Sequence, residues 1–328
     1  MKETLRTLTE AFGPSGSEQQ VREVILREVE QYADETQVDA LGNLVALRKG
    51  PGQRVMLAAH MDEIGLIVSH IDGKGFLRFA TVGGVRPLTL IGGRVRFADG
   101  TPGVIGVEKL EDPGKVPDLA RLFIDIGAAS KEEVHLRVGD VAVMDRPFDE
   151  AGSRVIAKAV DDRAGCAILI EVLRRLGDSR HELHFAFTTQ EEVGLRGATT
   201  CAYSVDPQLA LAVDVTPAGD TPKAAKMAIS LGGGAAIKVR DGGMLAHPGV
   251  KDLLVRRAQE REIPYQLEVL ENGTTDARAM QTSRAGVPTG VISVPCRYVH
   301  TASEMIDIRD AQASADLVLA VLENELEF

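Results

Sequence analysis

From about Val155 onwards, short apolar runs typical of β-strands take turns with longer stretches whose apolar residues recur at helical spacing. The helical stretches cover roughly residues 163–176, 250–261, 277–285 and 307–326. Strands that alternate with helices along a chain indicate a parallel sheet with helices on both faces. The sequence therefore predicts an α/β fold with a mostly parallel, helix-covered sheet.

A different pattern occupies residues 66–155, where short runs rich in Val and Ile are separated by Gly, Pro and Asp. Short strands with glycine turns predict a small all-β domain. Strand patterns of the larger domain lie on both sides of this region. We therefore expect residues 1–65 and 156–328 to form one catalytic domain into which the β-domain of residues 66–155 is inserted.

Charge and composition exclude several classes of protein. The net charge of the 328-residue chain is −11, which argues against nucleic acid or an anionic membrane as the main partner. No signal-peptide core opens the sequence, and no apolar run approaches the roughly 20 residues that span a bilayer. The three cysteines are widely spaced among apolar residues, which predicts buried thiols in a reducing compartment. We expect a cytoplasmic protein.

The apolar run that starts at Arg54 predicts a buried strand, yet it ends in His60, Met61, Asp62 and Glu63. Ionisable side chains are costly to bury unless something pairs or coordinates them. Four other strand patterns also end in such residues: Asp161 with Asp162, Glu191 with Glu192, Asp214, and His300. Because sites in open α/β sheets form at the carboxyl ends of the strands, we expect these side chains to gather at one edge.

Two histidines and at least three carboxylates, without cysteine, suit Zn²⁺, Co²⁺ or Mn²⁺. A mononuclear catalytic zinc uses only three protein ligands, so the set is large enough for two metals with a bridging carboxylate. One of Glu191 and Glu192 then remains as a general base, and Asp62 orients the ring of His60. Taken singly, each residue has a simpler explanation, such as a helix cap at Asp161. Five strand patterns that all deliver such residues to one edge of the sheet favour a metal site over five separate simple explanations.

Six segments carry a family resemblance: "AAHMDEIG", "AKAVDDRAGC", "TTQEEVGLRGA", "AVDVTPAGD", "GTTDARAMQ" and "RYVHTASEMID". In this order they resemble the M42 family of dinuclear metallo-aminopeptidases, over essentially the whole chain. The resemblance implies that His60 and Asp214 bind the first metal. It assigns Glu192 and His300 to the second metal, with Asp161 as the bridge.

The same resemblance implies a cis peptide between Asp161 and Asp162, Glu191 as the general base and Asp62 as the residue that orients His60. It implies a zinc-peptidase-like sheet and a PDZ-like inserted domain that builds dimers, which assemble further into a dodecamer in many members. The expected cofactors are two divalent ions per subunit, zinc first and cobalt as the alternative. The expected substrates are peptides with a free N-terminus. Thr274 departs from the family pattern, which usually has glycine there.

Three other functions remain open at this stage. A metal-dependent N-deacylase would use the same ligands on blocked substrates. A non-catalytic assembly or peptide-binding protein on this fold would be expected to lack Glu191 or a ligand, and all are present. A glycosidase could use two carboxylates, but the chain has no tryptophan and only 4% aromatic residues for stacking on sugars.

Overall fold

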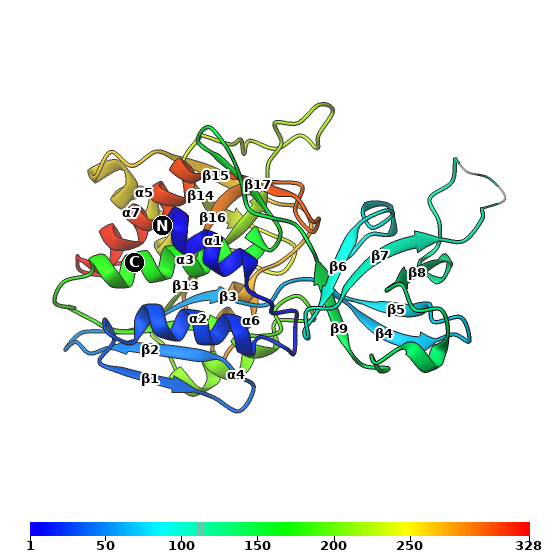
Figure 1. Ribbon diagram of the computed structural model, residues 1–328. Coiled ribbons are helices and arrows are strands. Elements are labelled where there is room, and N and C mark those ends of the chain that lie inside the picture. Colours follow the sequence, from blue (N-terminus) through cyan, green and yellow to red (C-terminus); the bar gives the residue numbers. More distant parts are fainter. Residues whose placement is uncertain (111, 113) are drawn as a thin grey trace.

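The computed structural model describes residues 1–110, 112 and 114–328. They form an 11-stranded sheet with its helices and, beside it, a closed six-stranded barrel (Figure 1). The chain enters the barrel after the central strand β3 and leaves it before the strand that precedes the helix α3. This placement agrees with an insertion into a larger domain.

The centre of the sheet is parallel, as predicted. Its four central strands, in spatial order, are β12 (Glu182–Thr188), β3 (Arg54–His60), β13 (Leu209–Pro217) and β16 (Thr289–Arg297). Along β3, Val55 and Leu57 face one apolar core whereas Met56 and Ala58 face another. Both faces of the strand are therefore covered, which explains why its sequence is apolar without a break.

The flanks of the sheet are antiparallel, so the sheet is mixed and the prediction of a mostly parallel sheet holds only for its centre. One flank is β1 (Glu35–Val38) with β2 (Leu44–Arg48), and the other is β17 (Glu304–Asp307), β11 (Arg154–Ala157) and β10 (Asp149–Ala151). A branch adds β14 (Ala235–Arg240), antiparallel to β16, and β15 (Tyr265–Val269). The links between β1 and β2, between β10 and β11, and between β16 and β17 are short, whereas a parallel pair needs a crossover of about a dozen residues or more.

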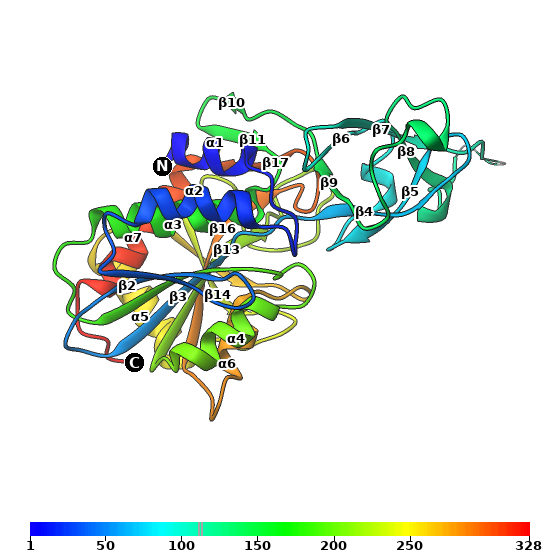
Figure 2. The same ribbon diagram turned by 60° about the horizontal axis from the view of Figure 1, so that its bottom comes forward.

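Helices cover both faces of the sheet (Figure 2), as predicted. The larger core contains side chains from α1 (Lys2–Glu10), α2 (Gln19–Val29), α3 (Val160–Arg175), α5 (Pro248–Glu260) and α7 (Ile308–Leu322). The opposite face carries α4 (Arg196–Val205) and α6 (Asp276–Gln281). Helix α4 is absent from the sequence prediction, because its buried side is made of the small residues Gly197, Ala198, Cys201 and Ala202.

The barrel confirms the predicted all-β region between the two halves of the sheet. Its strands are β4 (Gly65–Ile71), β5 (Leu77–Val82), β6 (Arg94–Phe97), β7 (Pro102–Val107), β8 (Leu122–Asp125) and β9 (Val141–Met144), with the short 3₁₀ turns η1 (Pro87–Thr89), η2 (Leu119–Arg121) and η3 (Lys131–Glu133). All of its strand pairs are antiparallel, and it has its own apolar core. The PDZ-like character and the domain boundaries stay predictions; β10, which starts at Asp149, already belongs to the large sheet.

Two further expectations concern the cysteines and the membrane. Cys166, Cys201 and Cys296 are all buried and free, as predicted. Within the described part of the chain, no helix has both the length and the apolar character needed to cross a membrane.

Candidate metal centre and active site

The strand ends bring the predicted site residues together. His60 is the last residue of β3, and Asp214 lies on the neighbouring β13. Asp161 lies in the first turn of α3, four residues after β11 ends, and the Asp161–Asp162 peptide is cis, as the family resemblance implied. Glu192 and His300 follow β12 and β16 in the loops at the same edge. The carboxyl edge of the sheet is thus where the ionisable residues meet.

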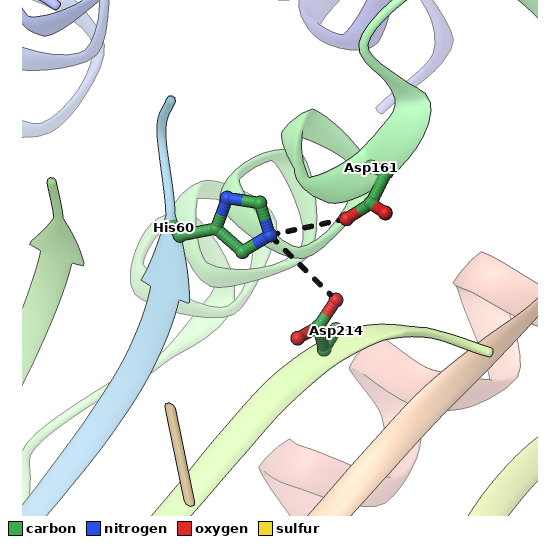
Figure 3. Close-up of side chains that lie close together, drawn as sticks. All are labelled: His60, Asp161 and Asp214. Carbon is green, nitrogen blue, oxygen red and sulfur yellow. Dashed lines mark hydrogen bonds and ion pairs between the residues drawn. The ribbon is translucent and has the colours of Figure 1, made fainter. Parts of the chain in front are cut away.

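His60, Asp161 and Asp214 form one group of potential metal donors (Figure 3). His60 Nε2 lies 3.0 Å from Asp161 Oδ1 and 3.9 Å from Asp214 Oδ1. The three side chains come from β3, α3 and β13 and point toward one another. At most 8% of any of these side chains is exposed, so water satisfies little of their polarity.

Asp161, Glu192 and His300 form a second group of donors. His300 Nε2 lies 3.3 Å from Asp161 Oδ2 and 3.2 Å from Glu192 Oε2. Asp161 therefore belongs to both groups, through a different oxygen in each. The other oxygen of Glu192, Oε1, is buried and accepts no hydrogen bond within the described structure. Such an atom is costly to bury unless a cation or a donor reaches it.

The charge of the cluster fits divalent cations. Its four carboxylates are Asp161, Glu191, Glu192 and Asp214, and among the described residues only His60 and His300 form ion pairs with them. Burial, followed by the charge of Asp161, raises the pKa of Asp214 to about 8 against the opposing effect of His60. Burial likewise raises the pKa of Glu191 well above its usual range. Positive charge inside the cluster would remove this cost, and imidazole with carboxylate is a donor set that Zn²⁺ and Co²⁺ accept.

Asp62 connects the first donor group to the loop after β12. Its carboxylate accepts hydrogen bonds from Ser15 Oγ at 2.6 Å and from the backbone N–H groups of Glu191 and Glu192 at 3.0 and 3.2 Å. His60 Nδ1 lies 3.1 Å from the backbone oxygen of Asp62 and 3.5 Å from its carboxylate. Asp62 thus contacts His60 through both its backbone and its side chain. Its carboxylate also fixes the backbone of the glutamate pair.

Glu191 stands beside the donors without belonging to either group. Its Oε2 lies 4.0 Å from His60 Nε2, and 11% of its side chain is exposed. It lines a cavity of about 1090 Å³ together with the donor residues, so solvent or a substrate can reach it. This is the position expected of a general base.

Sequence reasoning missed two structural supports of the site. Glu304 is 2% exposed and accepts the backbone N–H groups of Asp161 and His300. Gly84, in the loop after β5 of the barrel, lies so close to the His300 ring that a Cβ there would be 2.4 Å from Nδ1. Both residues lie inside ordinary short strand or turn patterns, so no signal marked them in the sequence.

The α/β fold, together with the buried cluster of potential metal donors at the carboxyl edge of the sheet, indicates a hydrolase whose active site can hold metal ions. The chain belongs to the M42 glutamyl aminopeptidase family, whose family model matches residues 42–317. It is therefore a peptide hydrolase of the aminopeptidase class.

Three relatives illustrate the match. The aminopeptidase APDkam598 from the archaeon Desulfurococcus kamchatkensis is 44% identical, with a TM-score of 0.96 over 99% of this chain and 94% of its own. The lysyl aminopeptidase of Pyrococcus furiosus is 36% identical, with 98% of this chain and 96% of its own covered. The TET1 peptidase of Pyrococcus horikoshii is 34% identical with a TM-score of 0.88, covers 98% of both chains, and can assemble into a tetrahedron or a large octahedral shell.

Proposed function

We propose that this aminopeptidase removes single N-terminal residues from peptides by means of a dinuclear metal centre and the general base Glu191. The observation that carries the proposal is the pair of donor groups that share Asp161, with Glu191 beside His60 and part of neither group. In this assignment His60 and Asp214 would hold one ion, Glu192 and His300 would hold the other, and Asp161 would be shared by both. Zinc is the first candidate and cobalt the second.

Two bound divalent ions would supply Lewis acidity, which polarises the scissile carbonyl and lowers the pKa of water. The remaining work falls to the chain itself. Glu191 accepts the proton of the attacking water and delivers it to the leaving amine. Its backbone N–H is held by Asp62, which anchors the point from which the side chain extends toward His60. Such an anchor helps because proton transfer requires the carboxylate to reach hydrogen-bond distance of the water.

The family favours aminopeptidase activity over N-deacylation. The matching family model is that of the M42 glutamyl aminopeptidases, and the relative from Pyrococcus furiosus that is 36% identical is a lysyl aminopeptidase. An aminopeptidase acts on a peptide with a free N-terminus, whereas an N-deacylase acts on a blocked one. A peptide with a free amine is therefore the expected substrate.

The Glu191→Gln variant tests the assignment of the base. We expect it to bind two metal ions per chain, because Glu191 is in neither donor group, and to lose about 10²–10⁴-fold in turnover. Metal content by mass spectrometry and peptide hydrolysis rates measure the two properties separately. Glu271→Gln, an exposed change near the cavity, is the matched control and should keep its activity. Ordinary turnover in Glu191→Gln would refute the role of Glu191.

We further propose that the chain forms a homo-oligomer through its barrel, as a dimer that assembles further. The barrel has an apolar hollow of about 570 Å³. Among its lining residues, Leu88, Ile91 and Val116 are 64%, 42% and 58% exposed. Apolar side chains that share an exposed hollow are typical of protein interfaces. The assembly of the TET1 peptidase supports the same inference.

A further inference from the structure

We propose that Glu304 is the positioning residue of the second metal site. It sets the metal affinity of that site by holding the backbones of Asp161 and His300 in fixed positions relative to each other. The inference rests on the proposed dinuclear function. One carboxylate binds both donors through their backbones: Oε2 accepts the N–H of Asp161 at 2.9 Å, and Oε1 accepts the N–H of His300 at 2.8 Å. With 2% of the residue exposed, water does not compete for these bonds.

The topology explains how one side chain reaches two distant segments. Glu304 is the first residue of β17, which pairs antiparallel with β11 and with β16. Asp161 follows β11 by four residues, and His300 follows β16 by three. Glu304 is thus at the point where both connections leave the sheet. Its carboxylate binds both connections, and the hydrogen bond to Asp161 spans 143 residues of sequence.

The backbone of His300 needs such a restraint. Its φ is +61°, in the left-handed region that residues with a Cβ seldom adopt. A residue there keeps its conformation only when its surroundings hold it. Glu304 binds its N–H from one side, and Gly84 of the barrel loop lies against its imidazole. The ring is therefore directed toward Asp161 and Glu192 by contacts that involve no metal.

The two metal sites should not depend on Glu304 equally. Of the donors of the first site, Glu304 contacts only the shared Asp161, and its carboxylate makes no hydrogen bond to His60 or Asp214. In the second site it holds two of the three donors. Loss of one of its hydrogen bonds should weaken the second ion more than the first.

Glu304→Gln tests this inequality. The amide keeps one acceptor oxygen but turns an NH₂ group toward the other backbone N–H, so one of the two bonds is lost. Zinc per chain is measured by mass spectrometry after dialysis against a series of buffered free-zinc concentrations. We expect the second ion to bind about 10–100-fold more weakly, as for other residues that orient metal ligands, and the first to change less.

Asp310→Asn is the matched control. Asp310 is 1% exposed and also accepts two backbone N–H groups, those of Gly232 and Gly234 at 2.7 and 2.8 Å, but it lies outside the donor cluster. The two variants should lower the unfolding temperature of the metal-free chain similarly, whereas only Glu304→Gln should change zinc content. If Glu304→Gln does not fold, Glu304→Asp replaces it. This variant keeps both acceptor oxygens on a shorter arm and should weaken the second ion to a smaller degree.

Several outcomes would overturn the inference. Two zinc ions with unchanged affinities in Glu304→Gln, equal weakening of both ions, or the same loss of zinc in Asp310→Asn would each contradict it. A wild-type chain that binds a single ion would instead refute the dinuclear centre itself. The failure of the inference and the failure of the proposed function are therefore distinguishable.

Discussion

Asp62 shows how one residue can serve two parts of the site. It lies two residues after the end of β3, so its backbone oxygen reaches the imidazole of His60 while its carboxylate accepts the N–H groups of the glutamate pair. The sequence indicated only the first role, orientation of His60. The second role depends on the loop after β12, whose path cannot be inferred from residue types. Asp62 therefore connects the proposed first metal site to Glu191, the proposed general base.

Gly84→Ala should disturb His300 without unfolding the chain. An added Cβ would lie 2.4 Å from His300 Nδ1 and 2.7 Å from Cε1, so the imidazole must move away from Asp161 and Glu192. We expect at least a tenfold loss of peptide hydrolysis and weaker binding of the second metal, since about 1 Å of misplacement can cost 10²-fold in rate.

Gly73→Ala is the control for this change. A Cβ at Gly73 meets no atom within 4 Å, so this variant should keep its activity. The hydrolysis rates and zinc contents of purified Gly84→Ala and Gly73→Ala test this prediction. Full activity in Gly84→Ala would mean that the barrel loop does not constrain His300.

At the residue scale, the sequence predicted the donors and Asp62 but not the other two supports, Glu304 and Gly84. His60, Asp161, Glu192, Asp214 and His300 all meet at one edge of the sheet, because strand-end positions are visible in the apolar pattern. Their assignment as ligands stays a prediction. Glu304 was not found, because it lies in a flanking strand whose pairing with both β11 and β16 is a tertiary property.

At the scale of elements, a buried ionic cluster fastens the connection between β11 and α3. Lys158 is 6% exposed and binds both oxygens of Glu63 at 2.8 and 2.7 Å. Arg163 is fully buried and donates to the backbone oxygens of Leu8 and Gly13 near the end of α1. The cluster joins the N-terminal segment to the chain on both sides of the barrel.

Lys158→Met should lower the free energy of unfolding by about 3–5 kcal/mol, because it leaves the carboxylate of Glu63 buried with only Arg163 at 3.5 Å. Lys49→Met is the control: its pair with Glu35 is more than 60% exposed, and such pairs contribute little to stability. Denaturant unfolding of the metal-free variants measures both changes. Equal effects of the two substitutions would contradict a structural role for the cluster.

Helices were predicted correctly where apolar residues recur at helical spacing, and they were missed where this pattern is absent. The stretches 163–176 and 250–261 became α3 and α5 with shifts of one to three residues. Helix α4 was missed, because the residues on its buried side are small and give no strong apolar pattern. The antiparallel flanks were missed as well, since strand patterns alone do not give pairing direction.

At the scale of the whole molecule, the charge of the cavity contrasts with that of the chain. The net charge is −11, yet outside the donor cluster the charged residues that line the cavity are Arg86, Lys238 and Arg278. Lys238 is paired with Glu268 at 2.9 Å, whereas within the described chain neither arginine forms an ion pair. Once metal ions offset the carboxylates, the cavity would be positive.

This charge predicts that peptides with an N-terminal glutamate are hydrolysed faster than those with an N-terminal lysine. Arg278→Glu should lower the ratio of the two rates at least tenfold, whereas Arg284→Glu, outside the cavity, should not change it. Rates on peptides that differ only in the first residue provide the measurement. A wild-type preference for lysine would show that the two arginines do not govern selectivity.

The proposed assembly makes its own prediction at this scale. Leu88→Glu puts a charge into the apolar hollow of the barrel and should break the oligomer into smaller species. Val138→Glu, an exposed change on the barrel but outside the hollow, is the control. Native mass spectrometry of both variants compares their masses with the wild type. An unchanged mass in Leu88→Glu would place the interface elsewhere.

The most direct test of metal-dependent aminopeptidase activity is digestion of a mixed peptide library, half of it N-acetylated, followed by mass spectrometry. The digestion is run before chelation, after chelation, and after the return of zinc or cobalt. We expect stepwise loss of N-terminal residues from the free half alone, abolished by the chelator and restored by metal. Cleavage of the acetylated half, or activity that survives chelation, would contradict a metal-dependent aminopeptidase.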